Sequence, residues 1–322
     1  MAAQSTYALQ VRGVTKRYGE HVAVSTLSFE AARGVIYGIL GPNGAGKSTT
    51  LRMINDILAP DEGEIRILDG LRPGRQAAER IGYLPEERGL YPKMRVLDTL
   101  QFFGELRGLS GREARTRGQS WLERLEISSW KDNKVQDLSK GMQQKVQFIT
   151  AVLHEPELLI LDEPWSGLDP INAEVLREIV LEQKAAGRTI LFSTHLMEQA
   201  EKICDAVCII ARGKKVLEGA LDDIKREAAS ERMVSVGFAS DEARDAAQAG
   251  PLADPDLVSS HDERDARTDV ELAAGIAPEQ LLTRLVKSGV AVRHFEPVEP
   301  TLHQIFVDRV GADEAAGEVA SE

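Results

Sequence analysis

The chain has 322 residues, of which 43% are hydrophobic and 28% charged, a composition typical of a folded protein with a sizeable core. Its formal net charge is −12 without any lysine-rich or arginine-rich run, which argues against nucleic acid as a main partner, because phosphate-backbone binding needs a clustered basic face. We expect neither a membrane span nor a signal peptide, since no apolar run reaches roughly 20 residues and the first ten residues lack a charged start and an apolar core.

The N-terminal residues predict a sheet edge followed by one strand–loop–helix unit. Residues 7–39 alternate apolar and polar side chains between glycines, which predicts an antiparallel edge. Residues 35–41 form a short apolar run that ends in glycine, and a helical pattern follows from Lys47 to about Leu58. A strand, a glycine loop and a helix in this order indicate a βα unit of an α/β fold.

Residues 95–126 predict two helices, with Ser110 as the cap between them. They interrupt the strand pattern, so we expect an inserted helical subdomain at about residues 86–137. Apolar strands return at residues 157–162 and 189–194, each followed by helical sequence. This order favours a mostly parallel sheet with helices on both faces.

The composition changes after about Leu221. We predict one α/β domain at residues 1–221 and a small accessory α+β domain at residues 222–311, where strand and helix patterns follow in the order β, β, α, β, α. Residues 312–322 carry four acids and no bases, which predicts a disordered acidic tail. The two cysteines, Cys204 and Cys208, are expected to be buried free thiols, although a disulfide is the alternative.

The first chemical motif is Gly-Pro-Asn-Gly-Ala-Gly-Lys-Ser-Thr at residues 41–49, which matches the phosphate-binding loop G-x-x-x-x-G-K-[ST]. Its glycines let several N–H groups converge on phosphates, to which the following helix presents its positive end. A plain glycine-rich turn would explain the glycines but not Lys-Ser-Thr behind a strand. Lys47 would contact the β- and γ-phosphates, and the Ser48 hydroxyl would ligate Mg²⁺. The nucleotide contacts predicted in this loop are Gly41, Asn43, Gly44, Gly46, Lys47, Ser48 and Thr49.

The second motif ends an unbroken apolar strand with two carboxylates, Asp162 and Glu163. Carboxyl ends of parallel strands are where α/β folds bind their ligands. Asp162 is placed to hold Mg²⁺ through water, and Glu163 to polarise an attacking water as general base. A solvated strand end is the alternative interpretation, and the phosphate loop makes it the weaker one.

The third motif is Leu-Ser-Lys-Gly-Met-Gln at residues 138–143, which opens an amphipathic helix with Ser139 as its N-cap. A capped helix alone would explain the pattern. Beside the other two motifs it resembles the signature motif of ABC ATPases, Leu-Ser-Gly-Gly-Gln, from which it departs at Lys140 and Met142. It keeps Ser139 and Gly141, the hydroxyl and the close-approach backbone that contact a γ-phosphate in that family.

The resemblance to ABC ATPases covers residues 8 to about 221. Asp169, in Ser-Gly-Leu-Asp, resembles the D-loop that crosses the dimer interface, and His195 resembles the switch histidine that contacts the γ-phosphate. Tyr18 matches the aromatic residue that stacks on adenine, with a buried strand tyrosine as the alternative. The family's Q-loop glutamine, which touches Mg²⁺ and relays nucleotide state to the membrane partner, aligns with Glu86. Glutamate keeps an oxygen for Mg²⁺ but adds a charge, and a side chain that merely faces solvent is the alternative.

The chain further resembles the ABC-2-type exporter ATPases, including those similar to the sodium-extrusion ATPase. This resemblance rests on three segments: the signature motif from residue 138, Pro-Glu-Glu at residues 85–87, and residues 299–306. This resemblance implies a P-loop NTPase fold of the ABC type, with an extra C-terminal domain, that uses ATP and Mg²⁺. It implies that ATP is held between two ATPase subunits, in a homodimer or a heterodimer. It further implies a multi-span membrane permease as partner, export, and a place at the cytoplasmic face of the membrane.

Two other function classes remain open. A soluble ABC ATPase acting on ribosomes or DNA would carry a second cassette or a long coiled coil, and the sequence shows neither. A nucleotide-binding regulator without catalysis would lack Glu163 or His195, and both are present. The transported substrate is not encoded here, because transport specificity resides in the membrane subunit.

Overall fold

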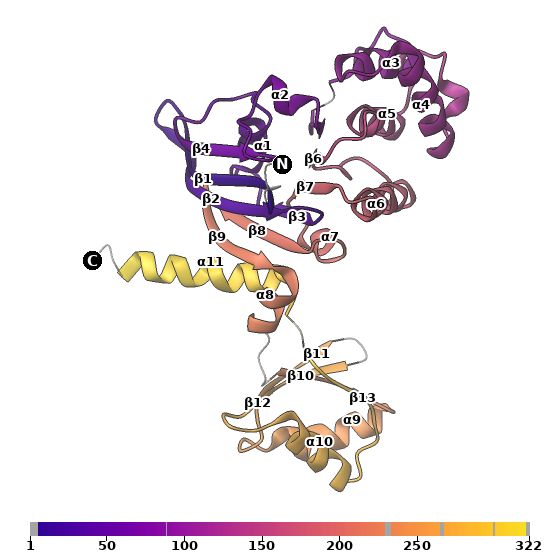
Figure 1. Cartoon of the computed structure of the whole chain (residues 1–322). Helices are drawn as coiled ribbons and strands as arrows, with labels where there is room; N and C mark the ends of the chain where they lie inside the picture. Colours follow the sequence, from indigo (N-terminus) through magenta and orange to yellow (C-terminus); the bar gives the residue numbers. More distant parts are fainter. Residues whose placement is uncertain (1–5, 88, 229–232, 265–266, 299, 320–322) are drawn as a thin grey trace. The chain divides into compact units, whose positions relative to one another are not determined.

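The computed structural model of the chain describes residues 6–87, 89–228, 233–264, 267–298 and 300–319. They form two compact units (Figure 1). One unit comprises the chain up to Leu221 and from Arg309 onward, and the other comprises residues 222–308. Each unit has an apolar core of its own.

The larger unit is built on a six-stranded sheet with the strand order β5-β6-β7-β3-β8-β9. Five strands run parallel, and β9 pairs antiparallel with β8, which confirms the mostly parallel sheet. Cys208, in β8, and Cys204 are buried free thiols, as predicted, and burial raises the pKa of both. The strands are β3 (Ile36–Leu40), β5 (Ile81–Leu84), β6 (Leu158–Asp162), β7 (Thr189–Thr194), β8 (Ala206–Ala211) and β9 (Lys214–Ala220).

A second, three-stranded antiparallel sheet with the order β2-β1-β4 confirms the predicted edge. Alternate apolar residues of β1 and β2 join a core that also contains residues of the main sheet. The ring of Phe29, in β2, stacks on Tyr37 of β3 with a centroid distance of 5.6 Å, so the two sheets share one core. The strands are β1 (Tyr7–Tyr18), β2 (His21–Ala32) and β4 (Glu62–Ile67).

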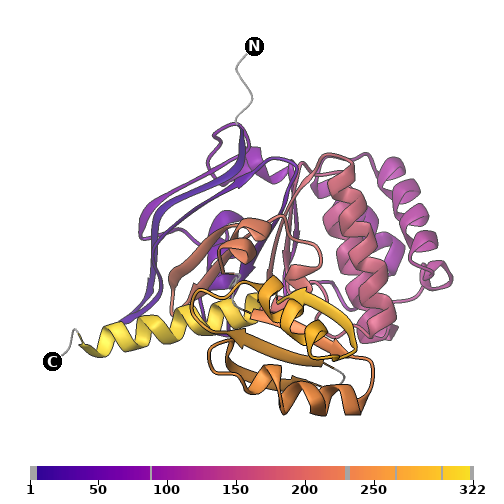
Figure 2. The ribbon, with the colours of Figure 1, turned by 90° about the horizontal axis from the view of Figure 1, so that it is seen from below.

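The two helices predicted around Ser110 are present. The Ser110 hydroxyl accepts a hydrogen bond from the Glu113 amide at 3.2 Å and so caps α4. In both views of the ribbon, α3, α4 and α5 lie at the opposite end of the larger unit from the three-stranded sheet (Figures 1 and 2). This segment contains α3 (Val96–Leu106), α4 (Gly111–Arg124), two short 3₁₀ helices, η1 (Ser128–Trp130) and η2 (Val135–Asp137), and α5 (Lys140–Val152).

Helix α1 (Lys47–Ile54) begins inside the phosphate loop and ends four residues before the predicted Leu58. Asp56 has a φ of +59°, a left-handed conformation that stops a right-handed helix. The Asn55 side chain donates to the Leu51 carbonyl at 2.9 Å, which caps this end. The remaining helices of the unit before Leu221 are α2 (Arg75–Ala78), α6 (Pro170–Ala185) and α7 (Met197–Glu201).

The smaller unit is α+β, as predicted, with a four-stranded antiparallel sheet in the order β11-β12-β10-β13. Buried valines of β10 and leucines of α10 form its core. Helix α8 (Leu221–Ala228) leads into this unit. Its other elements are β10 (Met233–Phe238), α9 (Asp241–Gln248), η3 (Pro251–Ala253), β11 (Val258–Arg264), β12 (Arg267–Leu272), α10 (Pro278–Lys287) and β13 (Val292–Pro297).

The predicted β, β, α, β, α order omits α8, η3, α9 and β11. Strand β11 pairs only with β12, at the edge of the sheet, and its sequence Val-Ser-Ser-His-Asp-Glu-Arg is mostly polar. Val258 is buried but residues 259–263 are exposed, so the alternation of apolar and polar side chains that indicates a strand is absent. Helix α9 buries little more than the small side chain of Ala247, which leaves no apolar stripe to detect.

The disordered tail predicted at residues 312–322 is wrong for residues 312–319. Helix α11 runs through Leu302–Val319 and includes them. Alanine and glutamate, which dominate this segment, have high helix propensity, so the scarcity of large apolar side chains does not prevent a helix here. Residues 320–322 of the predicted tail lie outside the described residues.

Candidate functional site

The phosphate loop connects β3 to α1 and depends on glycine at two positions. Gly41 has a φ of +149°, and a Cβ there would lie 2.0 Å from the Ile210 carbonyl oxygen. Gly46 has a φ of +102°, and a Cβ there would lie 2.5 Å from the Ala23 carbonyl oxygen. Any other residue would be strained and would collide with backbone, so only glycine allows this tight loop.

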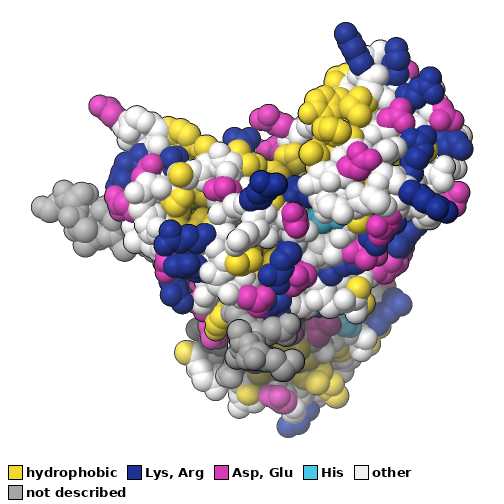
Figure 3. All heavy atoms as spheres, turned by 45° about the horizontal axis from the view of Figure 1, so that its top comes forward, with side chains coloured by type: hydrophobic (Ala, Val, Ile, Leu, Met, Phe, Trp, Pro, Cys, Tyr) yellow, Lys and Arg dark blue, Asp and Glu magenta, His cyan; other side chains and the backbone are white. Residues whose placement is uncertain are grey.

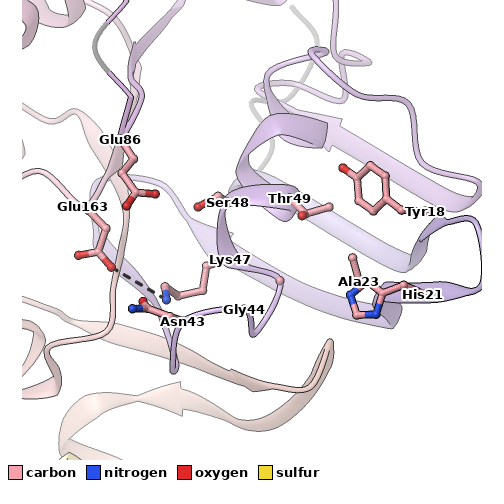
Figure 4. Close-up of a pocket in the computed structure, with 11 residues that line it drawn as sticks. Tyr18, His21, Ala23, Asn43, Gly44, Lys47, Ser48, Thr49, Glu86 and Glu163 are labelled. Carbon is pink, nitrogen blue, oxygen red and sulfur yellow. Dashed lines mark ion pairs between the residues drawn. The ribbon is translucent and has the colours of Figure 1, made fainter.

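A cavity of about 480 Å³ opens over this loop (Figure 4). It brings together most of the residues predicted from separate motifs, including Glu86 and Glu163. His21 and Ala23, which the sequence analysis missed, also line it. Tyr18 and His21 lie on one side and the two glutamates on the other, with Lys47 and Ser48 between them. The full lining is Tyr18, His21, Ala23, Asn43, Gly44, Gly46, Lys47, Ser48, Thr49, Glu86 and Glu163.

Lys47 is held inside the cavity by the loop itself. Its side chain is 6% exposed, and its ammonium group donates to the Gly41 carbonyl at 2.8 Å and the Pro42 carbonyl at 3.1 Å. It also lies 4.0 Å from a carboxylate oxygen of Glu163. Burial lowers the pKa of Lys47, and neighbouring carboxylates, led by Glu163, oppose this shift by favouring the charged form. The cavity therefore holds a preoriented ammonium group at its floor.

Asp162 lies at the end of β6 and bonds to hydroxyl groups of two other elements. Ser48 Oγ, at the start of α1, lies 3.3 Å from Asp162 Oδ1, and Ser193 Oγ of β7 donates to the same oxygen. Burial raises the pKa of Asp162, while the hydrogen bonds from Ser193 and Ser48 oppose this shift. The parallel register of β6 and β7 places Asp162 beside Ser193, so the sheet fixes this pair.

Glu163 follows β6 with a φ of +46°, a strained conformation for a residue that is not glycine. Its carboxylate accepts hydrogen bonds from the Thr194 hydroxyl at 3.1 Å and from the His195 amide at 3.0 Å. The His195 Nδ1 atom lies 2.8 Å from the same carboxylate. The end of β7 thus orients both the carboxylate and the imidazole, whose side chain is 43% exposed.

Tyr18 is 47% exposed at the end of β1, so it is not a buried strand tyrosine. The Lys16 ammonium lies 6.0 Å from the centre of its ring. His21 pairs with Tyr18 across the turn between β1 and β2, which explains why both reach the cavity. The two-residue turn Gly19-Glu20 between them is the sequence signal that could have identified His21.

Six predicted residues are not among those that line the cavity: Gly41, Asp162, His195, Ser139, Gly141 and Asp169. The first three bond to lining residues, namely Lys47, Ser48 and Glu163, whereas the other three lie at the start of α5 and of α6. The Ser139 hydroxyl is exposed and caps α5 by accepting from the Met142 amide at 3.3 Å. A Cβ at Gly141 would have only Leu168 within 4 Å, at 3.6 Å, so this chain leaves space there. Asp169 caps α6 by accepting from the Asn172 amide at 3.0 Å, and this bond lowers the pKa of its carboxyl.

Among the described residues, no three acidic, histidine or cysteine side chains cluster as a metal site would require on its own. The oxygens of Ser48 and Asp162 nevertheless meet beside the phosphate loop, and the Glu86 carboxylate points into the same cavity (Figure 4). Such oxygen groups suit Mg²⁺, which commonly takes one or two protein ligands and completes its coordination with phosphate and water.

The fold and the cavity together define a P-loop ATPase of the ABC type. A phosphate loop, a carboxylate pair and a histidine come from three strands of one parallel sheet, β3, β6 and β7. A helical segment that ends in the capped helix α5 is inserted between β5 and β6. This insertion distinguishes the ABC type from other P-loop proteins.

Comparisons with known proteins agree with this class. The ABC transporter family model matches residues 24–166, and the model of the C-terminal domain of DrrA1-3-like ATP-binding proteins matches residues 219–310. The uncharacterized ABC transporter ATP-binding protein YhaQ of Bacillus subtilis is 42% identical over 94% of this chain and 99% of its own length. The Nod factor export ATP-binding protein I of Cupriavidus metallidurans is 41% identical over 66% of this chain and 71% of its own.

Solved structures show the same cassette. An ATP-binding subunit of an ABC transporter superposes with a TM-score of 0.64 and 35% identity, covering 69% of this chain and 93% of that one. The ATP-binding cassette MJ0796, in a dimeric post-hydrolysis state bound to ADP and Pi, superposes with a TM-score of 0.61 and 25% identity. The match covers 66% of this chain and 98% of that one.

The chain therefore belongs to the family of ABC transporter ATP-binding proteins, and it is the ATP-binding and ATP-hydrolysing subunit of such a transporter. The expected resemblance, including the extra C-terminal domain, is confirmed. None of the helices within the described residues combines the length and the hydropathy that crossing a bilayer requires.

Proposed function

We propose that this chain hydrolyses ATP with Mg²⁺ at a site completed by a second copy, and that it drives export through a separate multi-span permease at the cytoplasmic face of the membrane. The observation that carries the proposal is the cavity that gathers Lys47, Ser48, Glu86 and Glu163. Relatives named as Nod factor export ATP-binding proteins support the direction of transport.

The phosphate loop binds the nucleotide. Lys47 exchanges its bonds with the Gly41 and Pro42 carbonyls for bonds with the β- and γ-phosphates, at little cost, because its side chain is already ordered. The backbone amides of the loop and of the first turn of α1 also face the phosphates. Tyr18 supplies an exposed ring on the other side of the cavity, where the adenine stacks.

Ser48, Asp162 and Glu86 would hold Mg²⁺, Asp162 through water. The ion would supply positive charge against the phosphate oxygens. Ser48 and Asp162 already touch, so their oxygens need little rearrangement. Glu86 adds a carboxylate where the family has an amide.

Glu163 acts as general base toward the attacking water. Its carboxylate is fixed by donors from Thr194 and His195, which leaves it oriented toward the cavity. As the water loses its proton to Glu163, the resulting hydroxide attacks the γ-phosphorus and ADP leaves. The exposed imidazole of His195 contacts the γ-phosphate while its Nδ1 atom stays on Glu163.

A second copy supplies Ser139 and Gly141 to the nucleotide. Both lie at the N-terminus of α5, and the open space at Gly141 accommodates a phosphate from outside the chain. Asp169, beside them, faces the same interface. A homodimer then carries two complete sites, because this chain has both Glu163 and the signature residues. The dimeric MJ0796 cassette supports this arrangement.

The permease docks on an aromatic cluster formed by exposed Tyr91 and by half-buried Phe102 and Phe103 of α3. The Tyr91 ring centre lies 5.6 Å from that of Phe102 and 6.2 Å from that of Phe103. Figure 3 shows hydrophobic side chains gathered on the part of the larger unit that carries α3. Exposed apolar clusters of this kind mark protein contacts.

We place the domain boundaries as the sequence suggests: the ATPase domain at residues 1–221, its helical subdomain at about residues 86–137, and the accessory domain at residues 222–311. The compact unit at residues 222–308 and the C-terminal family match at residues 219–310 support this division.

Two measurements test the proposal. The purified protein should hydrolyse ATP in the presence of Mg²⁺, and hydrolysis should stop when EDTA removes the metal. The tagged chain, isolated from detergent-solubilised membranes of its native cells, should co-purify with a multi-span permease, and Tyr91→Ser should lose that permease while keeping hydrolysis. Hydrolysis that is insensitive to EDTA would refute the metal role, and isolation with ribosomes or DNA in place of a permease would refute the transport role.

A further inference from the structure

The signature helix holds the Glu86 loop through one buried amide. Gln147, in α5, is 2% exposed and donates from Nε2 to the carbonyls of Pro85 and Glu87, each at 3.1 Å. These carbonyls belong to the residues immediately before and after Glu86. One side chain thus fixes the backbone on both sides of a residue that lines the nucleotide cavity.

The same face of α5 also contacts the backbone beside the proposed base. Gln144, which is likewise buried, donates to the Pro164 carbonyl at 3.2 Å, one residue after Glu163. Residues three positions apart lie on one helix face. Helix α5 therefore bonds, from one buried face, to both loops that carry glutamates into the cavity.

Burying a glutamine at position 147 is unfavourable if the side chain only fills space. Burying an amide costs free energy that its hydrogen bonds must offset, whereas an apolar side chain of the same length would fill the space without that cost. The distinctive contribution of Gln147 is therefore its two donated bonds, and both go to the Glu86 loop.

We propose that Gln147 is a positioning residue that couples the signature helix to Glu86. This inference rests on the proposed function, because the metal role of Glu86 and the contact of Ser139 with the second copy's ATP belong to it. When the N-terminus of α5 engages that ATP, a displacement of the helix reaches Glu86 through the Gln147 amide. The metal site of one nucleotide thereby responds to the closure of the other.

The test uses Gln147→Met, which keeps the length of the side chain and removes its donors. The Mg²⁺ concentration for half-maximal ATPase rate is measured for the full-length wild type, Gln147→Met, Glu86→Gln and the double variant, with a thermal melt of each. Thr150→Val is the control, because the Thr150 hydroxyl bonds at 2.6 Å to the Gln147 carbonyl within the same helix and its side chain is only half-buried.

We expect Gln147→Met to raise the half-maximal Mg²⁺ concentration about fivefold, the effect of about one net hydrogen bond. In the Glu86→Gln background it should add less than about twofold, because Gln147 acts through Glu86. Thr150→Val should leave the metal requirement unchanged. If the methionine variant does not fold, Gln147→Asn, whose amide is one methylene short of the two carbonyls, is scored in the same way.

An unchanged metal requirement in a folded Gln147 variant overturns the inference. So does an equal shift in both backgrounds, which general loosening of the helix would produce. A wild-type protein whose hydrolysis needs no Mg²⁺ would instead refute the proposed function itself, so the two failures are distinguishable.

Discussion

Individual side chains in this cavity are held in place by hydrogen bonds from their own chain. Glu163 takes a strained backbone conformation and is bonded by Thr194 and His195, while Lys47 is bonded to the carbonyls of its own loop. Groups that are ordered in advance lose little conformational entropy when the transition state forms. Single substitutions that preserve shape should therefore change chemistry without changing the fold.

Glu163→Gln should keep ATP binding, abolish turnover and trap an ATP-bound dimer. The amide retains the shape of the side chain and can still accept hydrogen bonds, but it cannot take a proton from water. General bases contribute about 10²–10⁴-fold to rate, so we expect a loss in that range. Size-exclusion chromatography with Mg-ATP reports the dimer, and Glu87→Gln, at a largely exposed side chain, is the matched control. Turnover within about threefold of the wild type would remove Glu163 from the role of base.

Glu86→Gln should leave the maximal rate within about tenfold, a barrier change of about 1.4 kcal/mol. The Mg²⁺ concentration for half-maximal rate should rise, because the variant loses a charged oxygen beside the metal. ATPase rates across a Mg²⁺ titration measure this directly. The neighbouring Glu87→Gln, whose partner is Arg52 at 3.5 Å on the surface, should leave the titration unchanged. Equal titrations for Glu86→Gln and wild type would place Glu86 outside the metal site.

Helix α5 combines an exposed N-terminus with a buried body. Its first turn presents Ser139 to solvent, whereas Gln144, Gln147 and most of its apolar residues are buried. The buried body anchors the helix to the loops of its own chain, and the free end remains available to another molecule. This division suits a helix that takes part in two sites at once.

Gly141→Asp should abolish hydrolysis while the protein remains folded. Position 141 lies in the first turn of α5, where a carboxylate interacts favourably with the helix dipole, so the thermal midpoint should not fall. The same charge would repel a phosphate from the second copy. Placed in the Glu163→Gln background, it should prevent the trapped dimer.

Arg112→Asp is the control for this element, because it puts a carboxylate at the equivalent position of α4, after the Ser110 cap. It should hydrolyse ATP at the wild-type rate. A Gly141→Asp variant that still hydrolyses ATP normally would show that the N-terminus of α5 does not approach a phosphate.

At the scale of the whole molecule, the smaller unit has its own closed core. Buried residues of β10, β12 and α10 pack together, and this core is separate from that of the larger unit. The residues that line the nucleotide cavity belong to the larger unit. We therefore predict that the accessory unit acts on dimerisation or on coupling, and the following truncation tests this.

A chain that ends at Leu221 should fold and bind ATP with affinity close to that of the full chain, while its dimerisation or its coupling to the permease changes. Circular dichroism melts, nucleotide calorimetry and the size-exclusion assay with Glu163→Gln measure the three properties. The isolated segment 222–308 should melt cooperatively. An insoluble truncated chain, or one that does not bind ATP, would place the boundary elsewhere.

Features that depend on a few consecutive residues can be predicted from the sequence alone. The phosphate loop, the strand that ends in Asp162 and Glu163, and the caps Ser110 and Ser139 each depend on a few consecutive residues, whose types dictate backbone conformation and hydrogen bonding directly. The parallel sheet and the family followed from these motifs and their order.

Contacts between residues that are far apart in the chain depend on the tertiary structure. Gln147 bonds to the Glu86 loop about 60 positions earlier in the chain, and the polar strand β11 forms because β12 offers it an edge. These contacts carry no local pattern, since their free energy comes from partners that the fold brings together. The helix at residues 312–319, by contrast, has a local signal, because its alanines and glutamates have high helix propensity.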